Sequence, residues 1–212
     1  MSTRSAVAGS DQPGGAEQEA PFTRRRFSVD EYYAMVPAGI LAEDERVELL
    51  DGEIVEKPRI SPPHANCVTR LHYTFFRRLD DDAVVWVHNP VRLDGYSVPE
   101  PNVTLLKRPL ERYVALPTPE DVLLIVEVAD DTSLDRNHAV KLPLYASAQI
   151  AETWIVNVKE REVEVYRQPS GDRYTEVQHL RDGKVTPLAF PDETIDIEEI
   201  LGPPPSDSPG DI

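Results

Sequence analysis

The chain is poor in cysteine, and it has no long apolar run. Cys67 is the only cysteine among 212 residues, so neither an internal disulfide nor a cysteine-based zinc site can form. The five histidines show no HExxH motif and no compact ligand spacing, which argues against zinc. No stretch approaches the roughly 18 apolar residues of a membrane helix, and no apolar signal segment is present. These absences predict a cytoplasmic protein without a membrane partner.

Positive charge is also scarce. The 22 lysines and arginines stand against 38 aspartates and glutamates, which gives a formal net charge of −16. Affinity for a polyanion comes mainly from basic side chains that neutralise phosphates, so this balance opposes nucleic-acid binding. Two local basic groups could still contact DNA, although we favour a structural role at helix ends: Arg70, Arg77 and Arg78, and Lys107, Arg108 and Arg112.

The two ends of the chain differ in composition from its centre. Residues 1–22 are rich in Ser, Gly, Ala and Glu, and residues 202–212 include PPPSDSPGD. Both segments are predicted to be disordered tails, because they cannot bury enough apolar surface. The remaining residues 23–201 are long enough for one domain with a substantial core, and no internal repeat suggests a second.

Local signals in the first half predict helices and a hairpin. Ser28 and Glu31 form a capping box, which predicts a helix over 29–36. The segment RVELLDGEIVEK alternates around Asp51-Gly52, which predicts a hairpin. Apolar residues at spacings of three and four predict a helix over 64–79. Buried Cys67 on this helix needs no function.

The second half reads as a sheet interrupted by one helix. Strands are predicted at 84–87, 90–93, 103–106 and 122–128. A helix over 137–148 contains Pro143, which predicts a kink or a start close to His138. Hairpins are predicted around 159–161 and around 182–183. The pattern is that of a mixed α/β (α+β) fold, in which helices cover at least one face of a sheet.

Glu127 is the one charged residue in the apolar run Val122–Val128. A carboxylate in an apolar layer is neutralised or binds a cation, unless it lies at an exposed strand end. The sequence therefore calls for a metal ion or a basic partner there. Arg136 is the nearest downstream cation, and Lys141 follows on the predicted helix.

Beyond Phe27 the sequence resembles the Uma-two family of predicted restriction endonucleases, within the PD-(D/E)XK nuclease class. The resemblance spans about 27–201 and is carried by several ordered segments: RVELLDGEIV, SPPH, NPVRLDGYSVPEPN, PTPEDVLLIVEVADDTSL, and VKLPLYA followed by TWIVNVKEREVEVYR. It implies a restriction-endonuclease-like core, namely a central mixed sheet flanked by helices. An added N-terminal helix and hairpin and C-terminal hairpins would complete the fold.

The resemblance also implies a chemistry, the hydrolysis of phosphodiester bonds in DNA with Mg²⁺ or Mn²⁺. Glu127 would be a metal ligand, with the backbone carbonyl of Val128 beside it. Lys141 would orient the attacking water or stabilise the transition state. Asn102 stands at the usual Pro-Asp position and would offer only an uncharged oxygen, which predicts weaker metal binding.

The sequence leaves open whether several further residues belong to the site. Glu48 either joins the metal site or is a solvated charge at a hairpin edge. Glu100 could replace the charge missing at Asn102, and His64 either points into the same cleft or is exposed. Asn137 and Asn157 also stand where relatives often have Asp.

Two functions therefore compete, a metal-dependent endonuclease and a catalytically inactive descendant that serves as a binding or regulatory module. The oligomeric state stays open as well, with a homodimer as one option.

Overall fold

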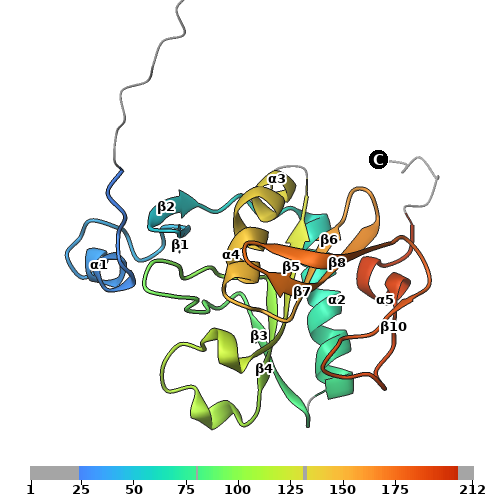
Figure 1. The fold of residues 1–212 in the computed structure, drawn as a ribbon. Coiled ribbons are helices and arrows are strands. Elements are labelled where there is room, and N and C mark those ends of the chain that lie inside the picture. Colours follow the sequence, from blue (N-terminus) through green and yellow to red (C-terminus); the bar gives the residue numbers. More distant parts are fainter. Residues whose placement is uncertain (1–23, 80, 131–132, 205–212) are drawn as a thin grey trace, which may run out of the picture.

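The computed structural model describes residues 24–79, 81–130 and 133–204. The predicted tail 1–22 and most of the predicted tail 202–212 lie outside these residues, so the predicted domain boundaries stay predictions. The described residues form a six-stranded mixed sheet with helices on both faces (Figure 1).

All neighbouring strands of this sheet run antiparallel except β5 and β6, which are parallel. A parallel pair needs a crossover, and the helical segment 134–147 supplies it. In spatial order the strands are β3 (Ala83–Val87), β4 (Val103–Lys107), β5 (Val122–Ala129), β6 (Glu152–Asn157), β7 (Glu162–Ser170) and β8 (Arg173–Leu180).

Side chains of β5 alternate between two cores. Leu124, Val126 and Val128 pack with α2 (Pro62–Leu79) in one hydrophobic cluster, while Ile125 packs with Tyr145 of α4 (Leu142–Ser147) in the other. Strand side chains point alternately to opposite faces. Glu127 therefore faces the α4 side of the sheet.

The predicted N-terminal elements are confirmed. The helix α1 (Val29–Met35) begins at the Ser28–Glu31 capping box. Strands β1 (Val47–Leu50) and β2 (Glu53–Glu56) form the hairpin, and Asp51 and Gly52 take φ angles of 50° and 80° in its turn. A Cβ on Gly52 would lie 2.5 Å from Cβ of Arg26, so this close approach requires glycine.

The helix predicted over 64–79 begins two residues earlier, since Pro62 and Pro63 occupy its first turn. Proline fits there because the first N–H groups of a helix have no intrahelical partner. Cys67 is buried on this helix as predicted, and burial raises its pKa to about 12.

The predicted strand 90–93 is wrong. Val91 and Leu93 donate only to the carbonyl oxygens of Pro99 and Ser97, and no strand is assigned over 90–93 in the described chain. Pro90 and Pro99 lack backbone donors, so this pair of loop segments cannot form a regular ladder.

The hairpin predicted around 182–183 is also wrong. β8 pairs with β7 across the turn at Gly171, whereas β9 (Lys184–Val185) pairs with β10 (Ile195–Asp196). Pro187 limits the length of β9. Val185 and Ile195 instead join the cluster around α2, together with α5 (Ile197–Leu201). Two short 3₁₀ turns, Leu110–Arg112 and Pro119–Asp121, lie between β4 and β5.

The crossover helix differs from the prediction in a way that matters for the site. It begins with α3 (Leu134–Arg136), not near His138, and continues through a π-turn, Asn137–Lys141, into α4. Pro143 occupies the first turn of α4. The predicted irregularity is therefore a π-turn just before the proline, and such turns are frequent at functional sites.

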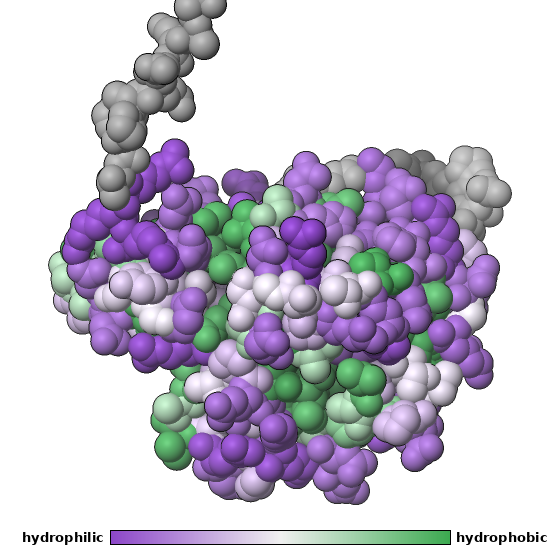
Figure 2. Space-filling model, in the orientation of Figure 1, coloured by the Kyte–Doolittle hydropathy of each residue, from purple (hydrophilic) through white to green (hydrophobic). Residues whose placement is uncertain are grey.

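The face drawn in Figure 2 is mostly hydrophilic, with hydrophobic groups in several separate places in both its upper and its lower half. None of the helices in the described chain combines the length and apolar character that crossing a membrane requires.

Candidate active site

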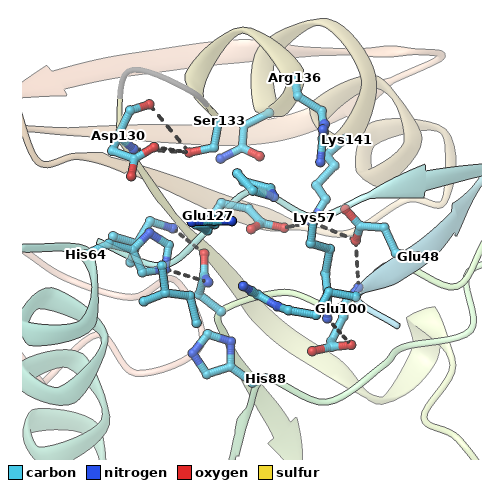
Figure 3. Close-up of a pocket in the computed structure, with 17 residues that line it drawn as sticks. Glu48, Lys57, His64, His88, Glu100, Glu127, Asp130, Ser133, Arg136 and Lys141 are labelled. Atoms are coloured by element: carbon cyan, nitrogen blue, oxygen red, sulfur yellow. Dashed lines mark hydrogen bonds and ion pairs between the residues drawn. The ribbon is translucent and has the colours of Figure 1, made fainter. Parts of the chain in front are cut away.

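A pocket opens where the β1–β2 hairpin, the start of α2, the adjoining ends of β4 and β5 and the π-turn come together (Figure 3). It contains the residues that the sequence proposed for the metal site and for catalysis, together with His64, Glu100, Arg136 and Asn137. Its lining consists of Arg46, Glu48, Lys57, Pro58, Arg59, Ile60, His64, His88, Glu100, Asn102, Glu127, Val128, Asp130, Ser133, Arg136, Asn137 and Lys141.

Glu127 is 3 % exposed and lies at the centre of this constellation. Its Oε1 atom accepts hydrogen bonds from Nζ of Lys141 at 3.1 Å and from the hydroxyl of Tyr145 at 2.6 Å. No described residue donates a hydrogen bond to Oε2. Burial raises the pKa of Glu127, and the nearby carboxylate of Glu48 adds to this, while Lys141 and Tyr145 act in the opposite direction.

Lys141 joins two carboxylates. Its Nζ atom lies 2.9 Å from Oε2 of Glu48 and 3.1 Å from Oε1 of Glu127, and all three side chains are almost fully buried. Burial alone lowers the pKa of Lys141, but the two carboxylates outweigh it and the net shift is upward. The ammonium therefore stays protonated near neutral pH, which suits electrostatic stabilisation and not proton abstraction.

Glu48 is a buried member of the pocket and not a solvated charge at the hairpin edge. Besides contacting Lys141, its Oε2 accepts the backbone N–H of Glu100 at 3.1 Å. The hairpin is held here by a bridge between Leu49 and Val98. Contacts between residues so far apart in the chain leave no local sequence signal.

Tyr145 was not among the predicted site residues. It lies four positions after Lys141, a spacing at which side chains share a helix face, and it is fully buried. Burial and the contact with Glu127 place its pKa well above the ordinary value. Its hydroxyl therefore keeps its proton and donates to Glu127. The i,i+4 spacing from Lys141 was the available sequence signal.

Asn102 is fixed by contacts on both sides of its amide. Its Oδ1 accepts the N–H of Val128 at 2.7 Å, which leaves Nδ2 facing Nε2 of His64 at 3.1 Å. Because Nδ2 can only donate, Nε2 must accept, so the neutral His64 ring carries its proton on Nδ1. Burial lowers the pKa of His64, which agrees with a neutral ring. His64 is buried in the pocket and not exposed.

The Val128 carbonyl faces the same side of β5 as its N–H, since both backbone groups of a strand residue point the same way. That side is the one from which Asn102 approaches, one residue before β4 begins. Glu100 is also in the pocket, with its carboxylate 2.6 Å from Nζ of Lys57.

The pocket has one more basic than acidic side chain although the chain as a whole is strongly acidic. Five lysines and arginines line it against four carboxylates, with two histidines besides, whereas the whole chain has a formal charge of −16. Two of its donors are unusual. Nη1 of Arg136 and Nδ2 of Asn137 are buried, and neither has a hydrogen-bond partner among the described residues. Leaving such a donor unsatisfied costs about 1–3 kcal/mol.

The basic groups predicted on α2 and after β4 lie outside this pocket. Arg78 binds Glu199 at 2.8 Å, and Arg112 binds Asp121 at 2.9 Å. Arg77 stacks over the ring of Tyr73. These contacts support the structural interpretation for the residues that make them.

A second group of potential ligand atoms lies on β7 and β8. Glu162, Glu164 and His179 place one ligand atom each within 4.8 Å of one another. Glu164 already contacts His138 and Tyr166, and Glu162 contacts Arg181. The sequence did not indicate this cluster, because it forms across strands.

Comparisons with known proteins agree with this fold. The model of the Uma2 (Uma-two) family, described as "Putative restriction endonuclease", matches residues 29–198. A crystal structure of a "putative nuclease belonging to DUF820" from Anabaena variabilis is similar with a TM-score of 0.67 and 16% identity, covering 82% of this chain and 97% of that one. At 16% identity, this structural likeness shows that the two chains share a fold and nothing more specific. A comparison with curated proteins finds no match.

Proposed function

The chain belongs to the Uma2 family, and from this premise we propose that it is an endonuclease that hydrolyses DNA phosphodiester bonds with Mg²⁺ or Mn²⁺. One observation carries the proposal: two buried carboxylates, Glu48 and Glu127, share a single ammonium group in a pocket that arginines also line. Buried acidic pairs are costly unless a cation binds them. The ammonium of Lys141 between the two carboxylates supports a site for positive charge here.

The donor atoms fit a hard divalent cation. Glu127, with Oε2 free of described donors, and Glu48 would hold it, together with the carbonyl of Val128 and the amide oxygen of Asn102. All of these are oxygen ligands, which Mg²⁺ and Mn²⁺ prefer. When bound, such an ion lowers the pKa of an attacking water and polarises the phosphate.

The protein's own groups have separate tasks. Lys141 carries its positive charge beside the reacting phosphate, where it stabilises the negative charge of the transition state. Tyr145 fixes the orientation of Glu127 through its short hydrogen bond. The arginines of the pocket offer local contacts for a polyanion that the rest of the acidic surface repels.

A second function remains a candidate, because Asn102 is engaged on both sides of its amide and Lys141 already fills the space between the carboxylates. A catalytically inactive nuclease-fold protein that binds or regulates a partner would tolerate both features. A nicking assay on supercoiled plasmid, with Mn²⁺ and with EDTA, separates the two functions. Mn²⁺-dependent nicking supports the endonuclease. No nicking, together with no heat of Mn²⁺ binding in calorimetry, supports the inactive module.

Asn102→Asp is expected to raise both Mn²⁺ affinity and nicking by about tenfold. The substitution adds a ligand charge beside Glu127 at nearly constant shape, and metal affinity increases with ligand charge. A tenfold change corresponds to about 1.4 kcal/mol, which is modest for a unit charge in a partly buried site. The new carboxylate also faces Nε2 of His64 and favours the protonated ring.

Asn157→Asp is the matched control. Asn157 is also buried, but it lies outside the pocket lining and accepts the N–H of Glu160. It should leave nicking unchanged. If Asn102→Asp behaves like this control, Asn102 does not contribute to a metal site.

Metal affinity should also depend on pH in a defined direction. Glu127 binds a cation only when ionised, and burial holds its pKa above the ordinary value. As the pH falls from neutral, Mn²⁺ affinity measured by calorimetry should therefore decline at a higher pH than an exposed glutamate would give. Tyr145→Phe removes a hydrogen bond that favours the ionised form, so the decline should shift further upward. An unchanged profile in this variant would contradict the assignment of Glu127.

A further inference from the structure

We propose that Arg136 and Asn137 form a subsite that binds one phosphate group of the nucleic-acid substrate, an inference that rests on the proposed nuclease function. Nη1 of Arg136 and Nδ2 of Asn137 are buried without an acceptor in the described chain. Both residues line the pocket that contains Glu127 and Lys141. Figure 3 shows Arg136 on the same side of this pocket as Lys141.

Buried donors without partners are rare in folded proteins and call for an explanation. Here two occur in adjacent residues and face one cavity, and both atoms can only donate. Arg136 makes no ion pair within the described chain, although four carboxylates line the same pocket. The acceptor that would satisfy both donors therefore lies outside the described residues, and the positive guanidinium selects an anion.

The π-turn explains how these donors reach the pocket together with Lys141. In a regular α-helix, positions five apart diverge by about 140°, because each residue adds about 100°. The wider turn over Asn137–Lys141 brings position 136 and position 141 closer to one face. The irregular backbone thus places Arg136, Asn137 and Lys141 around the same space.

The ligand chemistry follows from the donor set. A planar guanidinium beside an amide N–H₂ matches two oxygens of a phosphate, and Arg commonly binds phosphate in this paired manner. Lys141 is paired with Glu127 and Glu48, whereas Arg136 has no carboxylate partner among the described residues. The phosphate would therefore bind at Arg136 and Asn137, beside the reacting centre. Arg136 and Asn137 are thus substrate-binding residues, while Lys141 acts on the reacting group.

The test measures binding and not cleavage. A short DNA duplex with an end fluorophore is titrated in EDTA, and anisotropy gives Kd for the wild type, Arg136→Ala and Asn137→Asp. We expect Kd to rise about tenfold in Arg136→Ala. The slope of log Kd against log salt concentration should fall by about 1, the amount that one lost phosphate contact gives. Asn137→Asp, which replaces a donor by a negative acceptor, should weaken binding at least as much.

The matched control is Arg173→Ala, which removes the same charge from an exposed side chain on β8 outside the pocket. It should change Kd less than twofold. A second probe, inorganic phosphate, should raise the melting temperature of the wild type but not that of Arg136→Ala. Without phosphate, Arg136→Ala should melt no lower than the wild type, because the buried Nη1 has no described partner to lose.

The outcomes separate this subsite from the nuclease proposal. If the wild type nicks plasmid with Mn²⁺ but both variants bind DNA as tightly as Arg173→Ala, the two donors bind only water and the subsite is overturned. If no nicking occurs yet Arg136→Ala weakens DNA and phosphate binding, the subsite stands and the endonuclease fails. No response of the wild type to DNA or phosphate overturns the subsite as well.

Discussion

Lys141→Met is expected to lower the melting temperature in EDTA by roughly 6–20 °C. The substitution keeps the unbranched chain as far as the ε position but leaves Glu48 and Glu127 buried together without their cation. Removing one partner of a buried ion pair costs about 3–5 kcal/mol. For a chain of this size each kcal/mol corresponds to about 2–4 °C. Thermal melting followed by circular dichroism measures the shift.

Lys57→Met is the matched control in the same pocket. Nζ of Lys57 contacts Glu100 at 2.6 Å, but the side chains of this pair are 17% and 26% exposed. A partly exposed pair contributes about 1 kcal/mol or less, so this variant should melt within a few degrees of the wild type. Equal melting of the two variants would show that the carboxylates at Lys141 are not held as a charged group.

Mn²⁺ should act differently on the two forms of the site. In Lys141→Met a divalent cation can occupy the space between the carboxylates without competing with an ammonium. The melting temperature of this variant should therefore rise more on addition of Mn²⁺ than that of the wild type, since ligand binding to the folded state stabilises it. Nicking should nevertheless be lost, because the charge that stabilises the transition state is gone.

The site could be predicted from the sequence where it depends on local periodicity. The apolar run Val122–Val128 identified β5, and the alternation of its side chains fixed the face on which Glu127 lies. The charge in that run required a cation, and Lys141 provides it. The capping box at Ser28 and the turn at Gly52 were equally local, and both are present.

The rest of the site depends on contacts between distant segments. Glu48 reaches Lys141 only because the hairpin docks on the loop at Val98, and no local pattern encodes that docking. The sequence predicted an irregularity in this helix from Pro143, but it did not predict the π-turn itself, for a related reason. Helix periodicity assumes a constant 3.6 residues per turn, so it cannot place Arg136 and Lys141 on one side.

Proline decided the two errors in strand prediction. The segment 90–93 and the segment that follows the expected turn at 182–183 have apolar residues typical of strands, but Pro90 and Pro187 remove donors that a ladder needs. The chain consequently uses single backbone contacts at 90–93 and a two-residue pairing at β9. Composition indicated extended backbone in both places, and the missing N–H groups set how much of it could pair.

Glu127→Gln should leave the stability of the fold nearly unchanged, whereas Lys141→Met lowers it. Both substitutions should abolish or strongly reduce nicking. Glutamine has the same shape, and its oxygen can still accept from Lys141 and Tyr145. Its neutrality also removes the burial penalty that raises the pKa of Glu127, while Lys141 keeps Glu48 as its partner. The free energy of unfolding of the variant in EDTA should therefore lie within about 1 kcal/mol of that of the wild type.

Function should not survive this neutral substitution. Without the charge of Glu127, a divalent cation loses its most buried carboxylate ligand, and we expect no measurable heat of Mn²⁺ binding. Nicking should fall at least about a hundredfold, the scale of loss when one preorganised electrostatic group is removed. Glu164→Gln is the control, because Glu164 is also a buried strand glutamate but lies outside the pocket, beside His138 and Tyr166. Nicking by Glu127→Gln at the rate of this control would place the reacting centre elsewhere in the chain.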